Sequence, residues 1–324
     1  MPEKIFDAIS KLHVLVIGDI MIDRYFRGNV ERVSPEAPVP LVNIHESEDR
    51  LGGAANVALN CRALDAKVSL ASVIGLDADA TILLRILAEN EIDHSLVCKS
   101  ETRKTTCKTR ILSRNQQILR FDQEQEDDLN IKDEHSFIDL VLRFLQIQKP
   151  DIVIFEDYNK GVLKENVIQK IIRHCKNLGI LIAVDPKKKN FFAYKGVDIF
   201  KPNLKEIREG LNIPLDPVNL KNLTNSHQLL QTELNHKITF ITLSEKGVFY
   251  QNEGEGKILP SHHRNISDVS GAGDSVIAVA ALVYAATKNI DLMAAYSNIA
   301  GGLVCEEVGV VPVNKEKLLF EIKK

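Results

Sequence analysis

The sequence predicts an α/β fold in which a mostly parallel central sheet is covered by helices on both faces. Short apolar, β-branched runs alternate with helical patterns through most of the 324 residues. These runs are apolar throughout, as expected of parallel strands buried on both faces. Hydrophobic residues make up 44% of the chain and charged residues 26%, which suits a globular enzyme rather than a disordered or fibrous protein.

The buried strands are expected, in chain order, at Leu12–Gly18, Val68–Ile74, Asp151–Glu156, Gly179–Asp185, Asp198–Lys201 and Lys237–Leu243. Between and after them, apolar residues at three- and four-residue spacing predict helices over Ala54–Asp65, Ala78–Asn90, His135–Gln148, Lys164–Asn177, Lys205–Leu211, Thr224–Leu234, Gly273–Ala286 and Leu292–Glu306. Active sites in such sheets lie beyond the carboxyl ends of the strands, so we expect the site at that edge.

Two stretches break the alternation and predict a small β lid over the main sheet. Residues 25–50 contain the Pro-rich segment Arg32–Pro40 and the alternating Leu41–Ile44, and residues 104–122 are strand-like with a turn near Asn115. Both are typical of antiparallel ribbons with one polar face. A lid excludes water from phosphoryl transfer, and its exposed sheet is a common dimer surface. We therefore expect residues 1–324 to form one domain with these insertions, paired as a homodimer through the lid.

Composition excludes several classes of protein. The net charge of −3 gives no basic field for nucleic acid. No apolar run reaches the roughly 18 residues of a membrane span, and the charged N-terminal segment is unlike a secretory signal. The five cysteines form no Cys-x-x-Cys pair, which favours buried thiols in a reducing compartment. We expect a cytoplasmic protein that binds neither nucleic acid nor membrane.

The run Asp268–Asp274, which reads Asp-Val-Ser-Gly-Ala-Gly-Asp before a long apolar helix, says most about function. The backbone N–H groups of Gly271, Ala272 and Gly273 at a helix start form an anion site. A carboxylate there would repel a phosphate unless it takes a proton from the attacking nucleophile, so Asp274 is a candidate general base. The alternative is a capped helix after a Gly turn, with Asp274 merely favourable to the helix dipole.

Four segments, in this order and spacing, resemble the ribokinase-like (PfkB) carbohydrate kinase family over nearly the whole chain: Gly18–Asp23, Gly52–Asn56, Lys201–Glu206 and Asp268–Asp274. Others resemble the heptose-phosphate kinase branch of that family: Arg32–Pro40, Ser113–Gln117, Asp157–Leu163 and Asp185–Lys187. The resemblance implies a ribokinase-like fold. It also implies ATP-dependent phosphorylation of D-glycero-D-manno-heptose 7-phosphate at its anomeric 1-hydroxyl, on the way to ADP-heptose for lipopolysaccharide.

The sequence departs from this branch in two ways. In many bacteria the kinase is fused to a nucleotidyltransferase with a His-x-Gly-His motif, which is absent here, so we expect a separate adenylyltransferase. Val269-Ser270 also stands where the wider family often has a single threonine. Two alternatives stay open: another PfkB-type kinase for a sugar, sugar phosphate or nucleoside, and a catalytically silent sugar-phosphate sensor. An intact Asp274 argues against the sensor.

The resemblance places the sugar between the first strand and the lid. Carboxylates of Asp19 and Asp23 would accept hydrogen bonds from hydroxyls, although Asp23 could instead cap a turn or pair with Arg24. Backbone at Gly52 and Gly53 would approach the ligand closely and Asn56 would contact a hydroxyl pair, unless these residues only pack a helix entry on the sheet. Cations are needed for the phosphate that the substrate already carries, and the candidates are Arg110, Arg114, Arg120, Lys160 and Lys187.

The nucleotide side is implied by an Asn-x-x-Glu segment after a strand, Asn203, Leu204, Lys205 and Glu206, which the family places near the phosphates and magnesium. The same residues fit an Asn helix cap with Glu in the third helical position. Ser244 and Gly247 resemble the nucleotide loop, and Asn298 would border the adenine. Mg²⁺ should arrive with ATP, bound mainly through phosphates and water, so no metal ligand is assigned. The sequence does not decide whether a monovalent cation is needed.

Overall fold

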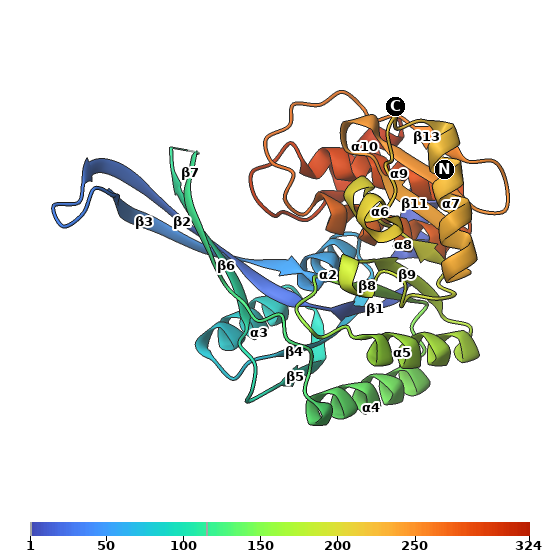
Figure 1. Ribbon diagram of the computed structural model, residues 1–324, viewed down its shortest axis with the longest axis horizontal. Helices are drawn as coiled ribbons and strands as arrows, with labels where there is room; N and C mark the ends of the chain where they lie inside the picture. The colour runs from blue at the N-terminus through green and yellow to red at the C-terminus, as the bar shows by residue number, and fades with distance from the viewer. Residues whose placement is uncertain (1, 115) are drawn as a thin grey trace.

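A computed structural model describes residues 2–114 and 116–324, so the turn predicted at Asn115 lies outside the described residues. The main sheet has nine strands in the order β13-β12-β11-β10-β9-β8-β1-β4-β5 (Figure 1). Two of its strand pairs are antiparallel, β11 with β12 and β12 with β13, at one edge, and the other described pairs are parallel. The strands are β1 (His13–Gly18), β4 (Lys67–Ile74), β5 (Asp93–Lys99), β8 (Ile152–Glu156), β9 (Leu181–Asp185), β10 (Ile199–Phe200), β11 (Ile238–Thr242), β12 (Val248–Gln251) and β13 (Lys257–Leu259).

Helices cover both faces of this sheet, as the continuous apolar strands predict. Alternate residues of β1 enter opposite clusters: Val14 and Val16 pack on one side, Leu15 and Ile17 on the other. The first cluster takes in α1 (Pro2–Ile9), α2 (Ala54–Ala63), α3 (Ala78–Glu89), α8 (Ala272–Thr287), α9 (Ile290–Val304) and α10 (Lys315–Ile322). The second takes in α4 (Ile131–Gln148), α5 (Glu165–Leu178), α6 (Leu204–Leu211) and α7 (Leu220–Leu234). Short 3₁₀ turns lie at Lys188–Asn190 and Ser244–Lys246.

The second sheet extends from the body as the lid (Figure 1). Its order is β3-β2-β6-β7, with bounds β2 (Ile20–Val33), β3 (Pro40–Gly53), β6 (Thr106–Ser113) and β7 (Gln116–Gln123). Each hairpin is antiparallel, and the two hairpins join through a parallel β2–β6 pair. The first ribbon is longer than the predicted 25–50. It begins directly after β1 and ends at the start of α2, because Ile20 and Leu51 are apolar and buried and keep the chain in the sheet.

Five elements were not predicted from the sequence: α1, β5, β12, β13 and α10. They are short and lie at the margins of the fold, where the hydrophobic pattern is weakest. Over the described residues, no helix combines the length and apolar character needed to cross a membrane.

Candidate active site

Asp274 lies buried in the first turn of α8, at the carboxyl edge of the main sheet. Its Oδ2 accepts a hydrogen bond from Asn56 Nδ2 at 2.8 Å, and its Oδ1 accepts one from Tyr158 Oη, also at 2.8 Å. Burial raises the pKa of Asp274 to about 6, while the Asn56 and Tyr158 hydrogen bonds favour the charged form. A carboxyl with this pKa is suited to accept a proton near neutral pH.

Asn56, predicted to contact a sugar hydroxyl pair, contacts the candidate base in this structure. It is fully buried in α2, and its Oδ1 accepts from Asn60 Nδ2 at 3.2 Å. These contacts fix the orientation of the amide, so that its N–H group is directed at Asp274. The helix that carries Asn56, α2, also packs on the sheet, as the alternative interpretation of this segment predicted.

The glycines before α8 have different reasons to be glycine. Gly271 has φ of 77°, and a Cβ there would lie 2.9 Å from Asn56 Nδ2. At Gly273 a Cβ would meet only Asp185 Oδ2 at 3.6 Å and Lys201 Nζ at 3.8 Å, which are ordinary contacts. Gly273 thus keeps a space open beside charged side chains. Ala272 N–H donates to Val269 O at 3.3 Å.

A group of charged side chains beside Asp274 was only partly foreseen. Lys201, buried after β10, pairs with Asp185 at the end of β9, with 2.7 Å between Nζ and Oδ2. Lys187 Nζ lies 2.8 Å from Glu206 Oε1 and 3.9 Å from Asp185 Oδ1. Burial alone would lower the pKa of Lys187, but the charges of Asp185 and Glu206 raise it above its ordinary value. Asp185, Lys201 and Tyr158 were not assigned from the sequence. Asp185 ends a strand, Lys201 directly follows one and Tyr158 lies two residues after one, and this position at a strand end is the signal that could have found them.

These residues line a cleft of about 960 Å³. Four of the seven residues assigned to the nucleotide from the sequence lie on it: Asn203, Ser244, Gly247 and Asn298. The Gly271–Gly273 turn, assigned to the transferred phosphoryl group, lines it as well. Gly247 has φ of 91°, and a Cβ there would lie 2.0 Å from Leu259 O, so this loop requires glycine. Asn298 Nδ2 donates to Pro260 O at 2.9 Å. The cleft is large enough for a nucleotide-sized ligand.

The rest of the Asn-x-x-Glu segment is used by the protein itself. Asn203 Oδ1 accepts from Glu206 N at 2.9 Å and Glu206 Oε2 accepts from Asn203 N at 2.8 Å, a reciprocal helix cap. Leu204 packs against the second hydrophobic cluster. Lys205 is exposed on α6, 3.8 Å from Glu209, and does not line the cleft. The capping alternative is therefore realised, and only Asn203 is also a cleft residue.

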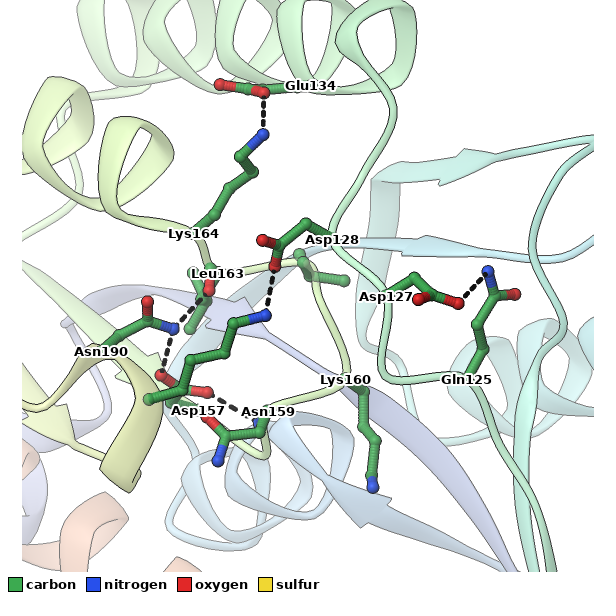
Figure 2. A network of polar contacts seen from close by, with 12 residues as sticks. Gln125, Asp127, Asp128, Glu134, Asp157, Asn159, Lys160, Leu163, Lys164 and Asn190 are labelled. Carbon is green, nitrogen blue, oxygen red and sulfur yellow. Dashed lines mark hydrogen bonds and ion pairs between the residues drawn. The ribbon is translucent and has the colours of Figure 1, made fainter.

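Asp19, predicted to be a sugar ligand, holds a neighbouring loop in place. Its buried carboxylate accepts three backbone N–H groups, from Tyr158 at 2.9 Å, Lys160 at 3.0 Å and Val162 at 3.1 Å. It thereby fixes the loop 157–164 that carries Tyr158. Figure 2 shows the other side of this loop, where Asp157 accepts from Asn190 Nδ2 at 3.2 Å and from the backbone N–H of Asn159 at 2.8 Å.

Asp23, Gly52 and Gly53 lie together at the base of the lid. Asp23 is buried and forms an ion pair with Arg110; Arg24 instead pairs with other carboxylates. A Cβ at Gly52 would lie 2.2 Å from Asp23 Oδ2, so the glycine makes room for that carboxylate. Gly53 has φ of 60° and leads directly into α2. Asp23 thus contacts Arg110, one of the cations predicted to bind the sugar phosphate.

Of those cations, most already have acidic partners. Arg120 pairs with Asp122 at 2.6 Å, and Arg114 is exposed. Lys160 Nζ lies 2.9 Å from Glu124 Oε1 and 2.7 Å from Glu126 Oε1. In Figure 2 its side chain extends away from the Asp157–Asn190 contact. Lys187, as described, belongs to the cleft beside Asp274 rather than to the lid.

Glu156, at the end of β8, is fully buried and neither of its carboxyl oxygens has a hydrogen-bond partner in the described structure. It lies opposite Asp185 in the β8–β9 register. Burial, followed by the charges of Asp185 and Asp274, raises its pKa well above the ordinary value.

Within the described residues no group of three or more His, Cys, Asp or Glu side chains is arranged to hold a metal ion. The acidic residues on the cleft wall are Asp185, Glu245 and Asp274, and Asp185 lies beside Lys187 and Lys201. This set fits a Mg²⁺ ion that is held mainly by nucleotide phosphates and water, with Asp185 as the nearby carboxylate.

Comparisons with known proteins agree with this geometry. Residues 11–317 match the model of the "pfkB family carbohydrate kinase". The chain is 39% identical over 303 residues to bifunctional protein HldE of Sulfurimonas denitrificans and 38% over 305 residues to bifunctional protein HldE of Helicobacter pylori. It covers 62% and 65% of those proteins, which cover 93% and 94% of this chain.

Solved structures share the fold at low identity. Phosphofructokinase-2 from Escherichia coli in complex with potassium superposes with a TM-score of 0.78 at 18% identity, over 97% of this chain and 99% of that one. Arabidopsis thaliana ribokinase complexed with ribose and ATP superposes with a TM-score of 0.72 at 16% identity, over 95% and 99%. The ribokinase-like fold is therefore present, and the chain belongs to the pfkB family of carbohydrate kinases.

Proposed function

We propose that the chain transfers the γ-phosphoryl group of ATP to the anomeric 1-hydroxyl of D-glycero-D-manno-heptose 7-phosphate, giving the 1,7-bisphosphate that leads toward ADP-heptose. The observation that carries the phosphoryl transfer is Asp274, a buried carboxyl with a pKa of about 6 at the start of α8 and on the wall of a nucleotide-sized cleft. The heptose assignment rests on the segments that resemble the heptose-phosphate kinase branch. It concerns the kinase reaction alone, since the chain spans less than two thirds of its HldE relatives.

The chemistry follows from the positions of these groups. Asp274 takes the proton of the sugar hydroxyl as its oxygen attacks the γ-phosphorus, and the bond to the β,γ-bridging oxygen breaks to release ADP. The N–H groups at the start of α8 stabilise the charge on the transferred group. Lys187 and Lys201 lie where they attract nucleotide phosphates. Mg²⁺, bound with the nucleotide, would neutralise further phosphate charge.

Three further proposals concern adenylylation, the compartment of the reaction and its need for a monovalent cation. We propose that adenylylation is performed outside residues 11–317, which match the kinase family. We also propose that the reaction takes place in the cytoplasm. The five cysteines are free thiols, in keeping with a reducing compartment. A requirement for a monovalent cation is measured by comparing turnover in potassium and in tetramethylammonium salts.

Substrate choice is tested by measuring ADP release with heptose 7-phosphate, unphosphorylated heptose, fructose 6-phosphate, ribose and a nucleoside. The proposal expects the highest kcat/KM for heptose 7-phosphate, with phosphorus NMR showing a new phosphate on C1. A higher value for any other acceptor would replace heptose 7-phosphate with that acceptor. ATP binding without turnover of any of them would favour the silent sensor.

The role of Asp274 is tested by Asp274→Asn. Loss of a general base should lower kcat by about 10²–10⁴ while ATP affinity and melting temperature stay close to those of the parent. Glu253→Gln, in an exposed loop, is the matched control and should leave kcat unchanged. Near-normal turnover by Asp274→Asn would remove this residue from the mechanism.

A further inference from the structure

We propose that Lys108, on β6 of the lid, binds the phosphate group that the sugar substrate carries before the reaction. Lys108 is not among the cations predicted from the sequence to bind the sugar phosphate. The inference deepens the proposed function and rests on its claim that the acceptor is a sugar phosphate, although it does not depend on which sugar.

The strand register places Lys108 on the face of the lid that carries charged side chains. On β6, Lys108 and Arg110 are two residues apart and therefore point to the same face. Across to β7, Arg110 pairs with Arg120. Across to β2, Lys108 pairs with Asp23. Successive residues of a strand alternate between faces, so these side chains share one face of the sheet.

This face is directed at the active site. Lys108 Nζ lies 5.5 Å from the centre of the Tyr158 ring, and Tyr158 Oη donates to the candidate base Asp274 at 2.8 Å. A sugar whose 1-hydroxyl reaches Asp274 would therefore extend past Tyr158 toward the lid. Its phosphate, at the other end of the molecule, would come to the face that carries Lys108.

Lys108 differs from its cationic neighbours in having no fixed counter-ion. Arg110 pairs with Asp23, Arg120 with Asp122, and Lys160 with Glu124 and Glu126. Among the described residues, the Lys108 ammonium lies against the Tyr158 ring and forms no ion pair.

The surroundings of Lys108 disfavour an unpaired ammonium. Burial, followed by the positive charge of Arg120, lowers its pKa, and the charges of Asp23 and Glu124 offset this only in part. A half-buried cation without a partner is costly, and an anionic ligand removes that cost. A phosphate monoester, with its double charge and several acceptor oxygens, is the ligand chemistry that fits.

Lys187 serves a different phosphate. Its Nζ lies 5.2 Å from the centre of the same Tyr158 ring, but it pairs with Glu206 and lines the large cleft beside Asp274. The ring of Tyr158 thus borders two ammonium groups, one on the body for the nucleotide and one on the lid for the sugar phosphate.

The test compares a phosphorylated sugar with the same sugar lacking phosphate. Lys108→Met keeps the length and apolar stem of the side chain but removes its charge. For heptose 7-phosphate, kcat/KM should fall by about 10- to 100-fold, the value of one charge-assisted hydrogen bond, mainly through KM. For unphosphorylated heptose, and for ATP affinity, there should be no change. Lys108→Arg should recover part of the loss.

The control is Lys99→Met, at an exposed position on β5, which should leave both substrates unaffected. Equal loss on the two sugars would mean that Lys108 acts through Tyr158 and would overturn the inference, as would no loss on either. If the parent enzyme prefers another sugar phosphate, the heptose assignment fails, and the same comparison is made with that sugar and its unphosphorylated form. A parent enzyme with no preference for any phosphorylated acceptor overturns both.

Discussion

Asp274 is surrounded by groups that act on its charge in opposite directions. Burial and the charge of Asp185 favour the neutral form, whereas hydrogen bonds from Asn56 and Tyr158 and the charge of Lys187 favour the carboxylate. The balance is a pKa of about 6. Since the base must be deprotonated to accept a proton, kcat/KM of the free enzyme should rise with pH through a midpoint near this value.

Tyr158→Phe tests this balance. Removing the hydroxyl removes a hydrogen bond that favours the charged form of Asp274, so the midpoint of the kcat/KM profile should move to higher pH. The kcat/KM profile is measured between about pH 5 and 9, a range that contains the Asp274 pKa of about 6 and leaves room for a shift to higher pH. Tyr194→Phe is the control, because its hydroxyl donates at 2.8 Å to Asp157 instead. An unmoved midpoint in Tyr158→Phe would show that this contact does not set the pKa of the base.

Residue roles were predictable where they depend on local sequence. The Gly-Ala-Gly-Asp turn suffices to identify Asp274 as a candidate base at a helix start. The contacts of Asn56 and Asp19 are not local: Asn56 meets Asp274 218 residues away and Asp19 meets Tyr158 139 residues away. Sequence spacing holds no information on such pairs, so these two contacts could not be predicted, and the sugar contacts predicted for both side chains stay predictions.

At the level of elements, two glycines at the start of α8 differ in what they do: the fold requires Gly271 but does not require Gly273. Gly271→Ala should lower the free energy of unfolding by about 1–2 kcal/mol, because of its left-handed backbone, with a further loss from the contact at Asn56 Nδ2. Gly273→Ala should unfold at nearly the parent temperature but transfer phosphate poorly, since the new methyl group would enter the space beside Asp185 and Lys201.

Thermal melting and ADP release together check this pair of variants. Equal loss of stability in both would contradict the distinction between the two glycines. Unimpaired turnover in a stable Gly273→Ala would show that the space beside Asp185 is not needed for phosphoryl transfer.

Helices and strands, like residue roles, could be predicted where the local sequence carries a clear pattern. The strands of the sheet centre were found because Leu15, Ile154 and Val184, for example, lie in unbroken apolar runs that are buried on both faces. β12 has only four residues, and the edge strand β13 has three and is largely exposed, so neither forms an apolar run of the length found at the sheet centre. The lid was recognised by its alternation, but its base was missed because Ile20–Ile22 reads as the continuation of a buried strand.

At the scale of the whole molecule, the two faces of the lid differ in character. The face opposite Lys108 and Arg110 exposes Leu119 and Phe121 of β7, which are 53% and 51% accessible. Large apolar side chains on an exposed sheet favour association with another sheet. We predict a homodimer formed through this face.

Light scattering coupled to size exclusion at micromolar concentration measures this association. Leu119→Glu combined with Phe121→Glu should yield monomers, whereas Phe320→Glu, an equally exposed apolar position on α10, should leave the dimer intact. A monomeric parent protein would refute the prediction.

The unpartnered carboxyl of Glu156 makes the global stability of the protein depend on proton uptake. Its pKa is raised on folding, so the folded state binds more protons, and its contribution to stability declines as the pH rises above the unfolded-state value of about 4.3. Glu156→Gln removes this linkage. From pH 5 to 8 its melting temperature should fall less steeply than that of the parent, and identical slopes would refute the argument. Variants that are more stable at neutral pH should therefore be sought first at this position.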